Sequence, residues 1–166
     1  PHHITQRGNR RQKVFFSDKD YETYMSLVSK ALISTDTRVL AYCLMPNHVH
    51  LIAVPSADDG LSRLFREAHV RYTRMINKRE NWRGHLWQER FHSFVMDEQH
   101  LLAAVRYVEL NPVRAGLCSH PEEWRWSSVH AHLCKQDDKL VTVKPMLDLI
   151  SSDWKMYLNY CDSSEE

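Results

Sequence analysis

The sequence predicts an α+β fold in which helices cover one antiparallel sheet. Two short apolar runs, residues 38–45 and 48–55, are separated only by the dipeptide PN, which indicates a β-hairpin. Two longer segments, residues 19–34 and 61–79, repeat apolar residues with the period of a helix. The length of 166 residues and the hydrophobic content of 43% suit one domain with its own core.

The first half of the chain supplies three strands and two helices. The start, HHIT, reads as a short extended segment, and the basic turn RGNRRQK follows it. The helix over 19–34 has a capping residue at Ser17 or Asp18. After the hairpin, residues 56–60 form a loop. The apolar face of the helix over 61–79 consists of Leu61, Leu64, Phe65, Ala68, Tyr72, Met75 and Ile76.

The second half adds a strand and a further helix. WQERFHSFVM (87–96) reads as a strand, and the helix over 98–110 starts at Asp97 and ends at Pro112 and Gly116. The remainder predicts two short helical segments and a mobile acidic tail. Strand, helix, strand, strand, helix, strand is the β-α-β-β-α-β plan of a ferredoxin-like or RRM-like sheet, here with an added helix.

We expect one domain over residues 1–130 and a C-terminal helical extension over 131–166, packed on the same domain. The net charge of +1 neither favours nor excludes a nucleic-acid partner. The sequence has no apolar run long enough to cross a bilayer and no secretion leader, so we expect a cytoplasmic protein without a membrane partner. Its cysteines, which form no C-x-x-C pair and are expected to be reduced, are Cys43, Cys118, Cys134 and Cys161.

Two histidines one residue apart interrupt the second hairpin strand. His48 and His50 share one face of that strand, where two imidazoles can bind a divalent ion. Two satisfied polar side chains at a sheet edge are the commoner explanation of H-x-H alone. Tyr107 and Asn111, four residues apart, share a face of the helix over 98–110. Taken singly, the tyrosine is more often a packing residue and the asparagine a helix stop; the four together indicate a site.

YCLMPNHVHLIAVP, LWQERFHSFVMD and RYVELNPVRAGL resemble the transposase domain of the single-tyrosine HUH (histidine, hydrophobic, histidine) enzymes. Within them the sequence is similar to the insertion-sequence-200-like group and its REP-associated tyrosine transposases. The resemblance runs from HHITQRGNRRQKVFF to PEEWRWSS, near residue 128. Many REP-associated members open with a glycine-pair motif, and this sequence has HHITQRGN in its place. In that group a tetranucleotide near the hairpin guides cleavage. The departure affects what the resemblance implies about contacts with that tetranucleotide.

The resemblance implies the roles of four residues. His48 and His50 would bind Mg²⁺ or Mn²⁺, and Asn111 would complete the metal site where related enzymes use glutamine. Tyr107 would attack the scissile DNA phosphate and form a 5′-phosphotyrosine intermediate. The substrate would be single-stranded or hairpin DNA of a palindromic repeat, and the protein a monomer or a homodimer.

Basic residues are the candidates for DNA contacts. They are Arg7, Arg10, Arg11 and Lys13 in the basic turn, Arg63, Arg71, Arg74 and Lys78 along one helix, and Arg90 and Arg114 beside the expected site. A solvated face is the alternative for the helical stripe. The aromatic candidates for base stacking, of which at least two are expected to be structural, are Trp82, Trp87, Trp124 and Trp126.

Two other functions remain open at this stage. An RRM-like module would bind nucleic acid without cutting it, and Tyr107 would then not act as a nucleophile. A metallohydrolase would use water as its nucleophile and would keep its activity without the tyrosine hydroxyl.

Overall fold

The computed structural model describes residues 1–159. Its strands are β1 (His2–Arg7), β2 (Thr37–Met45), β3 (His48–Pro55) and β4 (His92–Val95). Its long helices are α1 (Asp18–Ser34), α2 (Gly60–Glu80) and α3 (Glu98–Arg114). The shorter helices are α4 (Val129–Cys134), α5 (Lys144–Leu149) and α6 (Trp154–Asn159), with 3₁₀ turns at Asn9–Arg11 and Pro121–Glu123.

The strands form one antiparallel sheet in the order β2-β3-β1-β4. This order places the first and third strands at the centre, as the β-α-β-β-α-β plan requires, so the predicted ferredoxin-like fold is confirmed. The register sets Thr5 of β1 opposite His50 of β3. On the other side of β1, the pairing with β4 runs only from His2 to Thr5.

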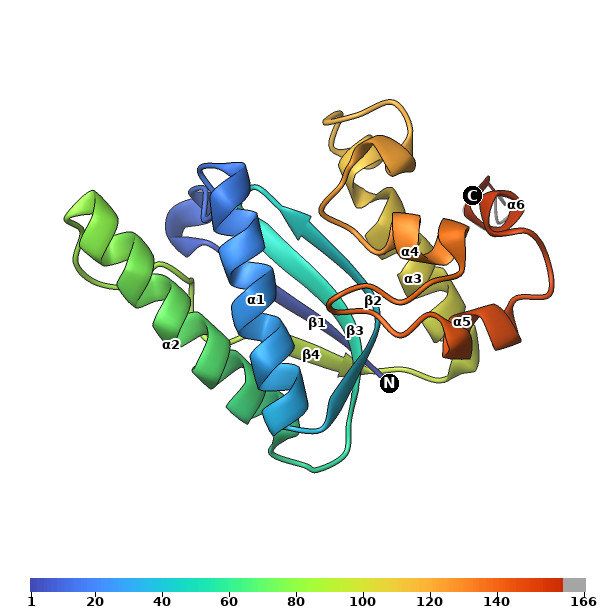
Figure 1. Cartoon of the computed structure of the whole chain (residues 1–166), viewed down its shortest axis with the longest axis horizontal. Helices are drawn as coiled ribbons and strands as arrows, with labels where there is room; N and C mark the ends of the chain where they lie inside the picture. Colours follow the sequence, from blue (N-terminus) through green and yellow to red (C-terminus); the bar gives the residue numbers. More distant parts are fainter. Residues whose placement is uncertain (160–166) are drawn as a thin grey trace.

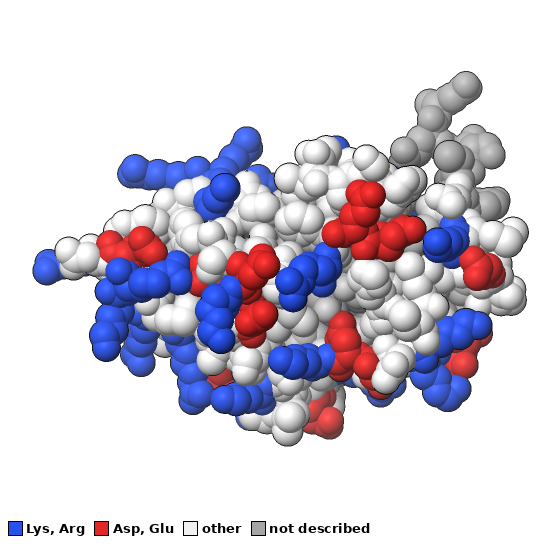
Figure 2. Space-filling view, turned by 45° about the horizontal axis from the view of Figure 1, so that its top comes forward, with Lys and Arg blue, Asp and Glu red and all other residues white. Residues whose placement is uncertain are grey.

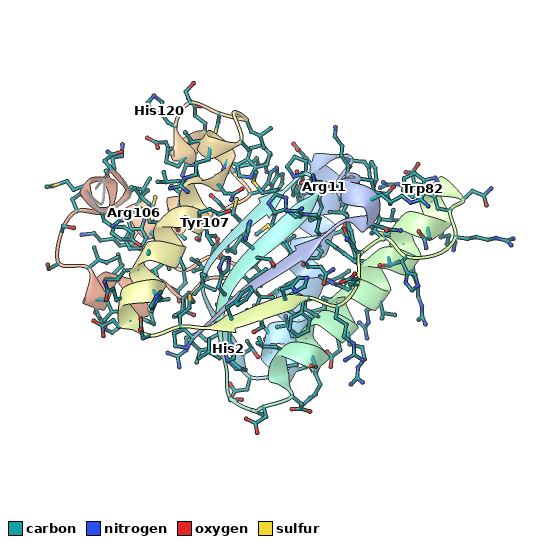
Figure 3. The ribbon with its side chains drawn as sticks, turned by 180° about the vertical axis from the view of Figure 1, so that it is seen from behind. His2, Arg11, Trp82, Arg106, Tyr107 and His120 are labelled. Carbon is teal, nitrogen blue, oxygen red and sulfur yellow. The ribbon has the colours of Figure 1, made fainter. Side chains whose placement is uncertain are left out.

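Helices cover both faces of the sheet. α1 and α2 lie on one face (Figure 1), and α3 packs on the other face against β2 and β3 (Figure 3). Side chains along each strand point alternately to the two faces. Leu44 and Val49 join the core beneath α1 and α2, whereas Cys43 and Ile52 join the core beneath α3. A strand buried on both faces reads as a nearly continuous apolar run, which is what the hairpin segments show.

The helices α1 and α2 begin and end within one residue of the predicted bounds. Ser17 occupies the capping position of α1, although its side chain makes no capping hydrogen bond. The predicted apolar face of α2 is buried except for Met75, which is half-buried. His69 is buried as well, and its Nε2 lies 2.9 Å from the hydroxyl of Tyr24 on α1. This contact joins the two helices across their interface.

Two element ends differ from the prediction. β4 begins at His92 rather than at residue 87, because residues 88–91 leave the sheet around Glu89, whose φ is 56°. α3 continues through Pro112 to Arg114, so the predicted stop at the proline is wrong. A proline removes one N–H donor, but the amides of residues 115–117 close the last turn on carbonyls of residues 111–113. The chain then turns at Gly116, with φ of 70°.

The C-terminal part contains three short α-helices within the described residues, not the two segments predicted. α4 and α6 lie against α3, and Trp154 of α6 donates a hydrogen bond to Glu109 of α3 (2.8 Å). The division at residue 130 stays a prediction, and the expected acidic tail falls on residues 160–166, outside the described residues.

Three cysteines are free, of which Cys43 is buried, whereas Cys161 lies outside the described part of the chain. Among the helices of residues 1–159, none combines the length and apolar character that crossing a membrane requires.

Candidate active site

The two histidines of β3 project from an inner strand of the sheet. β3 lies between β2 and β1, so the alternative of a polar pair at a sheet edge is wrong. The ring centroids of His48 and His50 are 4.9 Å apart. Val49, between them in sequence, is fully buried in the core on the opposite face. The two-residue period of the strand therefore places both imidazoles on the α3 side of the sheet.

Asn111 and His3 complete a polar cluster around this pair. The amide Nδ2 of Asn111 lies 3.5 Å from Nε2 of His50. The same side chain hydrogen-bonds to His48. From β1, Nε2 of His3 lies 3.1 Å from Nδ1 of His50, and Nδ1 of His48 lies 2.6 Å from Oδ1 of Asn47. Side chains of β1, β3 and α3 thus meet at one point.

α3 brings Tyr107 to the same cluster. Its ring centroid lies 5.7 Å from that of His50, with the ring planes at 88°, and 6.2 Å from that of His3. The tyrosine side chain is 39% exposed, so a ligand can reach it. The guanidinium carbon of Arg114 lies 5.2 Å from the centre of the tyrosine ring. Figure 3 shows Tyr107 on α3, beside the strands of the sheet.

Burial keeps the imidazoles of β3 neutral at physiological pH. It lowers the pKa of His48 to about 4, assisted by the charge of Arg7 and opposed by a hydrogen bond with Asn111. Burial also lowers the pKa of His50 to about 3, with further contributions from His48, His3 and Arg7. A neutral imidazole has one ring nitrogen with a free lone pair, which is the form that binds a metal.

The donors of the cluster suit a divalent cation. Within residues 1–159, no group of three His, Cys, Asp or Glu side chains is arranged to hold a metal. The side chain of Asn111 contacts both imidazoles, so its amide oxygen is a candidate third donor beside them. Its Nδ2 now faces His50, and exchanging the amide O and N positions would turn the oxygen toward the histidines. Imidazole donors favour transition metals over Mg²⁺, which prefers oxygen ligands.

A cavity of about 510 Å³ adjoins the cluster. His48, His50 and Tyr107 line it together with Arg7, which contributes a positive charge. The cavity joins the two candidate metal-binding histidines, the candidate nucleophile and a basic side chain in one space.

Six residues around this cavity were missed by sequence reasoning: His3, Thr5, Gln6, Gln88, Glu89 and His92. His3 had a usable signal, because antiparallel pairing of β1 with β3 places alternate residues of β1 on the face of His48 and His50. The segment HHIT is recognisable as extended, but its partner strand is not evident from the sequence. Glu89 had no signal, since it lies in a segment predicted to be strand.

The ten basic candidates do not form one surface. Arg7 borders the cavity and Arg114 lies beside Tyr107, whereas Arg74 and Arg90 line a second groove next to α2. Arg63 is half-buried and forms an ion pair with Asp59 at 4.0 Å, which is typical of a solvated helix face. The other candidates are exposed and line neither space: Arg10, Arg11, Lys13, Arg71 and Lys78. Lys and Arg side chains gather on the left of Figure 2, the side that α2 occupies.

The tryptophans are mostly structural. Trp87 and Trp126 are buried, and the indole N–H of Trp124 donates to the carbonyl of Leu44 (3.0 Å). Trp82, which is 42% exposed, is the one of the four candidates with an open ring.

The fold and the cluster define an α+β protein whose central sheet strand presents paired histidines to a tyrosine on a crossing helix. The family described as "Transposase IS200 like" matches residues 2–111. This match spans more than half of the chain and includes every residue of the cluster. The chain belongs to this family of transposases, and the resemblance inferred from its motifs is confirmed.

Relatives within the family share a more specific description. The chain is 23% identical over 128 residues to a REP-associated tyrosine transposase of Escherichia coli (strain K12), covering 76% of this chain and 74% of the relative. It is 28% identical over 102 residues to a putative REP-associated tyrosine transposase of Haemophilus influenzae, covering 55% and 58% respectively. A solved REP-associated tyrosine transposase, bound to a REP hairpin, has a similar fold: the TM-score is 0.69 at 21% identity, over 85% of this chain and 84% of that one.

Proposed function

We propose that this protein is a REP-associated tyrosine transposase that cleaves and rejoins single-stranded DNA, and that Tyr107 is its nucleophile. The observation that carries the proposal is the position of the tyrosine ring, 5.7 Å from the neutral imidazole of His50 at an open cavity. Membership of the transposase family supports cleavage and transfer of DNA as the kind of reaction.

The proposed reaction exchanges one phosphodiester bond for another. The hydroxyl oxygen of Tyr107 attacks the scissile phosphorus, and the bond to the preceding 3′ oxygen breaks. The tyrosine proton passes to solvent, and the departing 3′ oxygen takes up a proton to become a free 3′-OH. Because the 5′-phosphotyrosine bond conserves the energy of the broken bond, attack by a 3′-OH can rejoin strands without ATP. Arg7 and Arg114 lie where their charges would stabilise the phosphate.

We assign His48, His50 and Asn111 to a divalent cation, Mg²⁺ or Mn²⁺. When bound, the cation would offset the negative charge that develops on the phosphate and on the departing oxygen. Each histidine is oriented through its Nδ1. The Nδ1 of His50 contacts His3, and the Nδ1 of His48 contacts Asn47. Such contacts fix the ring and leave Nε2 for a ligand.

The proposed substrate is a hairpin of a palindromic repeat with unpaired flanking nucleotides. The solved relative bound to a REP hairpin supports this substrate class. One chain supplies the tyrosine and both histidines, so the proposal holds for a monomer and for a homodimer. We place its action in the cytoplasm, at the nucleoid.

A covalent-adduct assay tests the proposal. A labelled hairpin with single-stranded flanks is incubated with the protein and Mn²⁺ and run on a denaturing gel. We expect a protein–DNA adduct with the wild type, none with Tyr107→Phe, and little with His48→Ala or after chelation. Tyr157→Phe is the control, because that hydroxyl donates to the carbonyl of Leu102, away from the cavity.

The assay separates the two other functions from this one. An adduct with Tyr107→Phe would remove the tyrosine from its assigned role. Cleaved DNA without any adduct would indicate a metallohydrolase that uses water. Tight binding with neither product would indicate a binding module.

A further inference from the structure

A second groove, of about 690 Å³, lies between α2 and residues 84–91. The family match gives it no role, and neither the tyrosine nor the histidine pair lines it. Arg66 and Arg74 of α2 form one side, and Arg90 and Phe91 belong to the other. The sequence stripe of basic residues includes Arg74 but not Arg66, so it does not describe this groove.

Three unpaired cations line the groove. Arg66, Arg74 and Arg90 are exposed, and no ion pair or hydrogen bond joins any of them to another part of the described chain. Glu89 is the acidic residue of the lining. Arginines that converge without carboxylate partners indicate an anionic ligand, and phosphate is the group that a planar guanidinium binds best.

The floor of the groove is aromatic and has an unused hydrogen-bond donor. Trp87 is only 8% exposed, and its indole N–H has no partner within residues 1–159. The ring stacks on His69 with centroids 4.2 Å apart, while Phe91 is half-buried against Phe65 at 4.7 Å. A buried donor without an acceptor is destabilising, and this floor lacks a polar partner within the described chain. Cations above aromatic rings are the combination that holds unpaired nucleotides.

The groove adjoins the candidate active site. Gln6 and Glu89 line both spaces, so they form the border between them. β4 pairs with β1 only as far as Thr5, which leaves the end of β1 without a strand on that side. The loop there is fixed by hydrogen bonds from the amide of Gln88 to Arg7 (2.8 Å) and from Gln6 to Gln88 (2.8 Å). The two spaces therefore meet at this sheet edge, on either side of the loop that carries Gln88.

We propose that this groove binds the unpaired nucleotides adjoining the scissile phosphate, with Arg66, Arg74 and Arg90 on their phosphates and Phe91 beside a base. The proposal rests on the proposed function, because it assumes that a single strand occupies the cavity at Tyr107. It names the substrate feature that the groove reads: a single-stranded flank rather than the hairpin itself.

The experiment compares two substrates and two variants of the full chain. The substrates are a bare hairpin and the same hairpin with an unpaired flank of about eight nucleotides, within the range that single-strand sites cover. The groove variant is Arg66→Ala/Arg74→Ala. Its matched control, Arg71→Ala/Lys78→Ala, removes the same charge from exposed positions of the same helix outside the groove. Affinity is measured by fluorescence anisotropy at several salt concentrations.

We expect the groove variant to bind the flanked substrate about 10- to 100-fold more weakly and the bare hairpin within about 2-fold of the wild type. The slope of log affinity against log salt should fall by about 1.4 for the flanked substrate, or about 0.7 for each of two lost phosphate contacts. The control should weaken both substrates by one common factor. Equal losses for the two variants on the flanked substrate, or an equal loss of the groove variant on both substrates, would overturn the proposal.

These outcomes are independent of cleavage. A failed adduct assay together with a flank-specific loss would remove the proposed reaction and keep the groove as a binding site. An adduct that forms normally in the groove variant, with unchanged affinity for the flanked substrate, would remove the groove and keep the reaction.

Discussion

Replacing Glu109 tests how the tyrosine-bearing helix is held to the C-terminal helices. Glu109 lies on α3, two residues from Tyr107, and is fully buried. Its carboxylate accepts hydrogen bonds from Ser128 (2.6 Å), His132 (2.6 Å) and Trp154 (2.8 Å). A single side chain thereby joins α3 to the residues at the start of α4, within α4 and in α6.

The magnitude follows from the donors that Glu109→Ala leaves behind. The hydroxyl of Ser128 can turn to the carbonyl of Tyr42, 3.3 Å away, so it keeps an acceptor. The ring N–H of His132 and the indole N–H of Trp154 lose theirs, at about 1–3 kcal/mol each. We therefore expect a loss of about 4 kcal/mol in the free energy of unfolding, out of the roughly 5–15 kcal/mol of an ordinary domain.

Urea denaturation measures this loss. With a slope of about 2 kcal/mol per molar urea, the midpoint should fall by about 2 M. Glu98→Ala is the control, because it removes an exposed glutamate from the same helix and should change stability by about 0.5 kcal/mol or less. In a double-mutant cycle, Trp154→Phe should destabilise the wild type more than it destabilises the Glu109→Ala variant. A midpoint shift of about 0.3 M or less, or strict additivity in the cycle, would refute this reasoning.

Two further predictions concern buried histidines. Burial lowers the pKa of His69 to about 3, so between pH 6.5 and 3 the unfolded chain binds a proton that the folded chain does not, and stability falls as the pH falls. From pH 7 to pH 5, urea titrations should show the wild type losing about 2 kcal/mol more than His69→Gln, and equal losses would contradict this assignment. His50→Ala should abolish Mn²⁺ binding measured by calorimetry, whereas the exposed His130→Ala should retain it; unchanged binding by His50→Ala would exclude the proposed ligand set.

The strands and helices that carry the site could be predicted because their periodic patterns lie within single short segments of the sequence. The period of two along β3 predicts that His48 and His50 share a face, and the turn of α3 does the same for Tyr107 and Asn111. Bringing these two pairs together required only the β-α-β-β-α-β plan and a helix that crosses the sheet. The proline inside α3 misled the prediction because it removes only the one bond of its own N–H, and the amides of residues 115–117 still close the last turn.

The remaining parts of the site depend on contacts between distant segments. His3 joins the cluster through the pairing of β1 with β3. The register of that pairing cannot be predicted from the sequence of either strand alone. Arg66 and Arg90 line the same groove because residues 88–91 leave the sheet, although the sequence analysis included these residues in a strand. The side chain of Glu109 joins three helices, α3, α4 and α6, and no periodicity indicates a buried glutamate on a helix that otherwise reads as amphipathic.

Mapping the attachment site of DNA on the protein tests the central claim most directly. The adduct formed with a flanked hairpin and Mn²⁺ is digested with a protease and a nuclease, and the modified peptide is sequenced by mass spectrometry. We expect one nucleotide 5′-phosphate on the hydroxyl oxygen of Tyr107, in the peptide that also contains Asn111. Attachment to any other residue, or a cleaved strand with no modified peptide, would contradict the account.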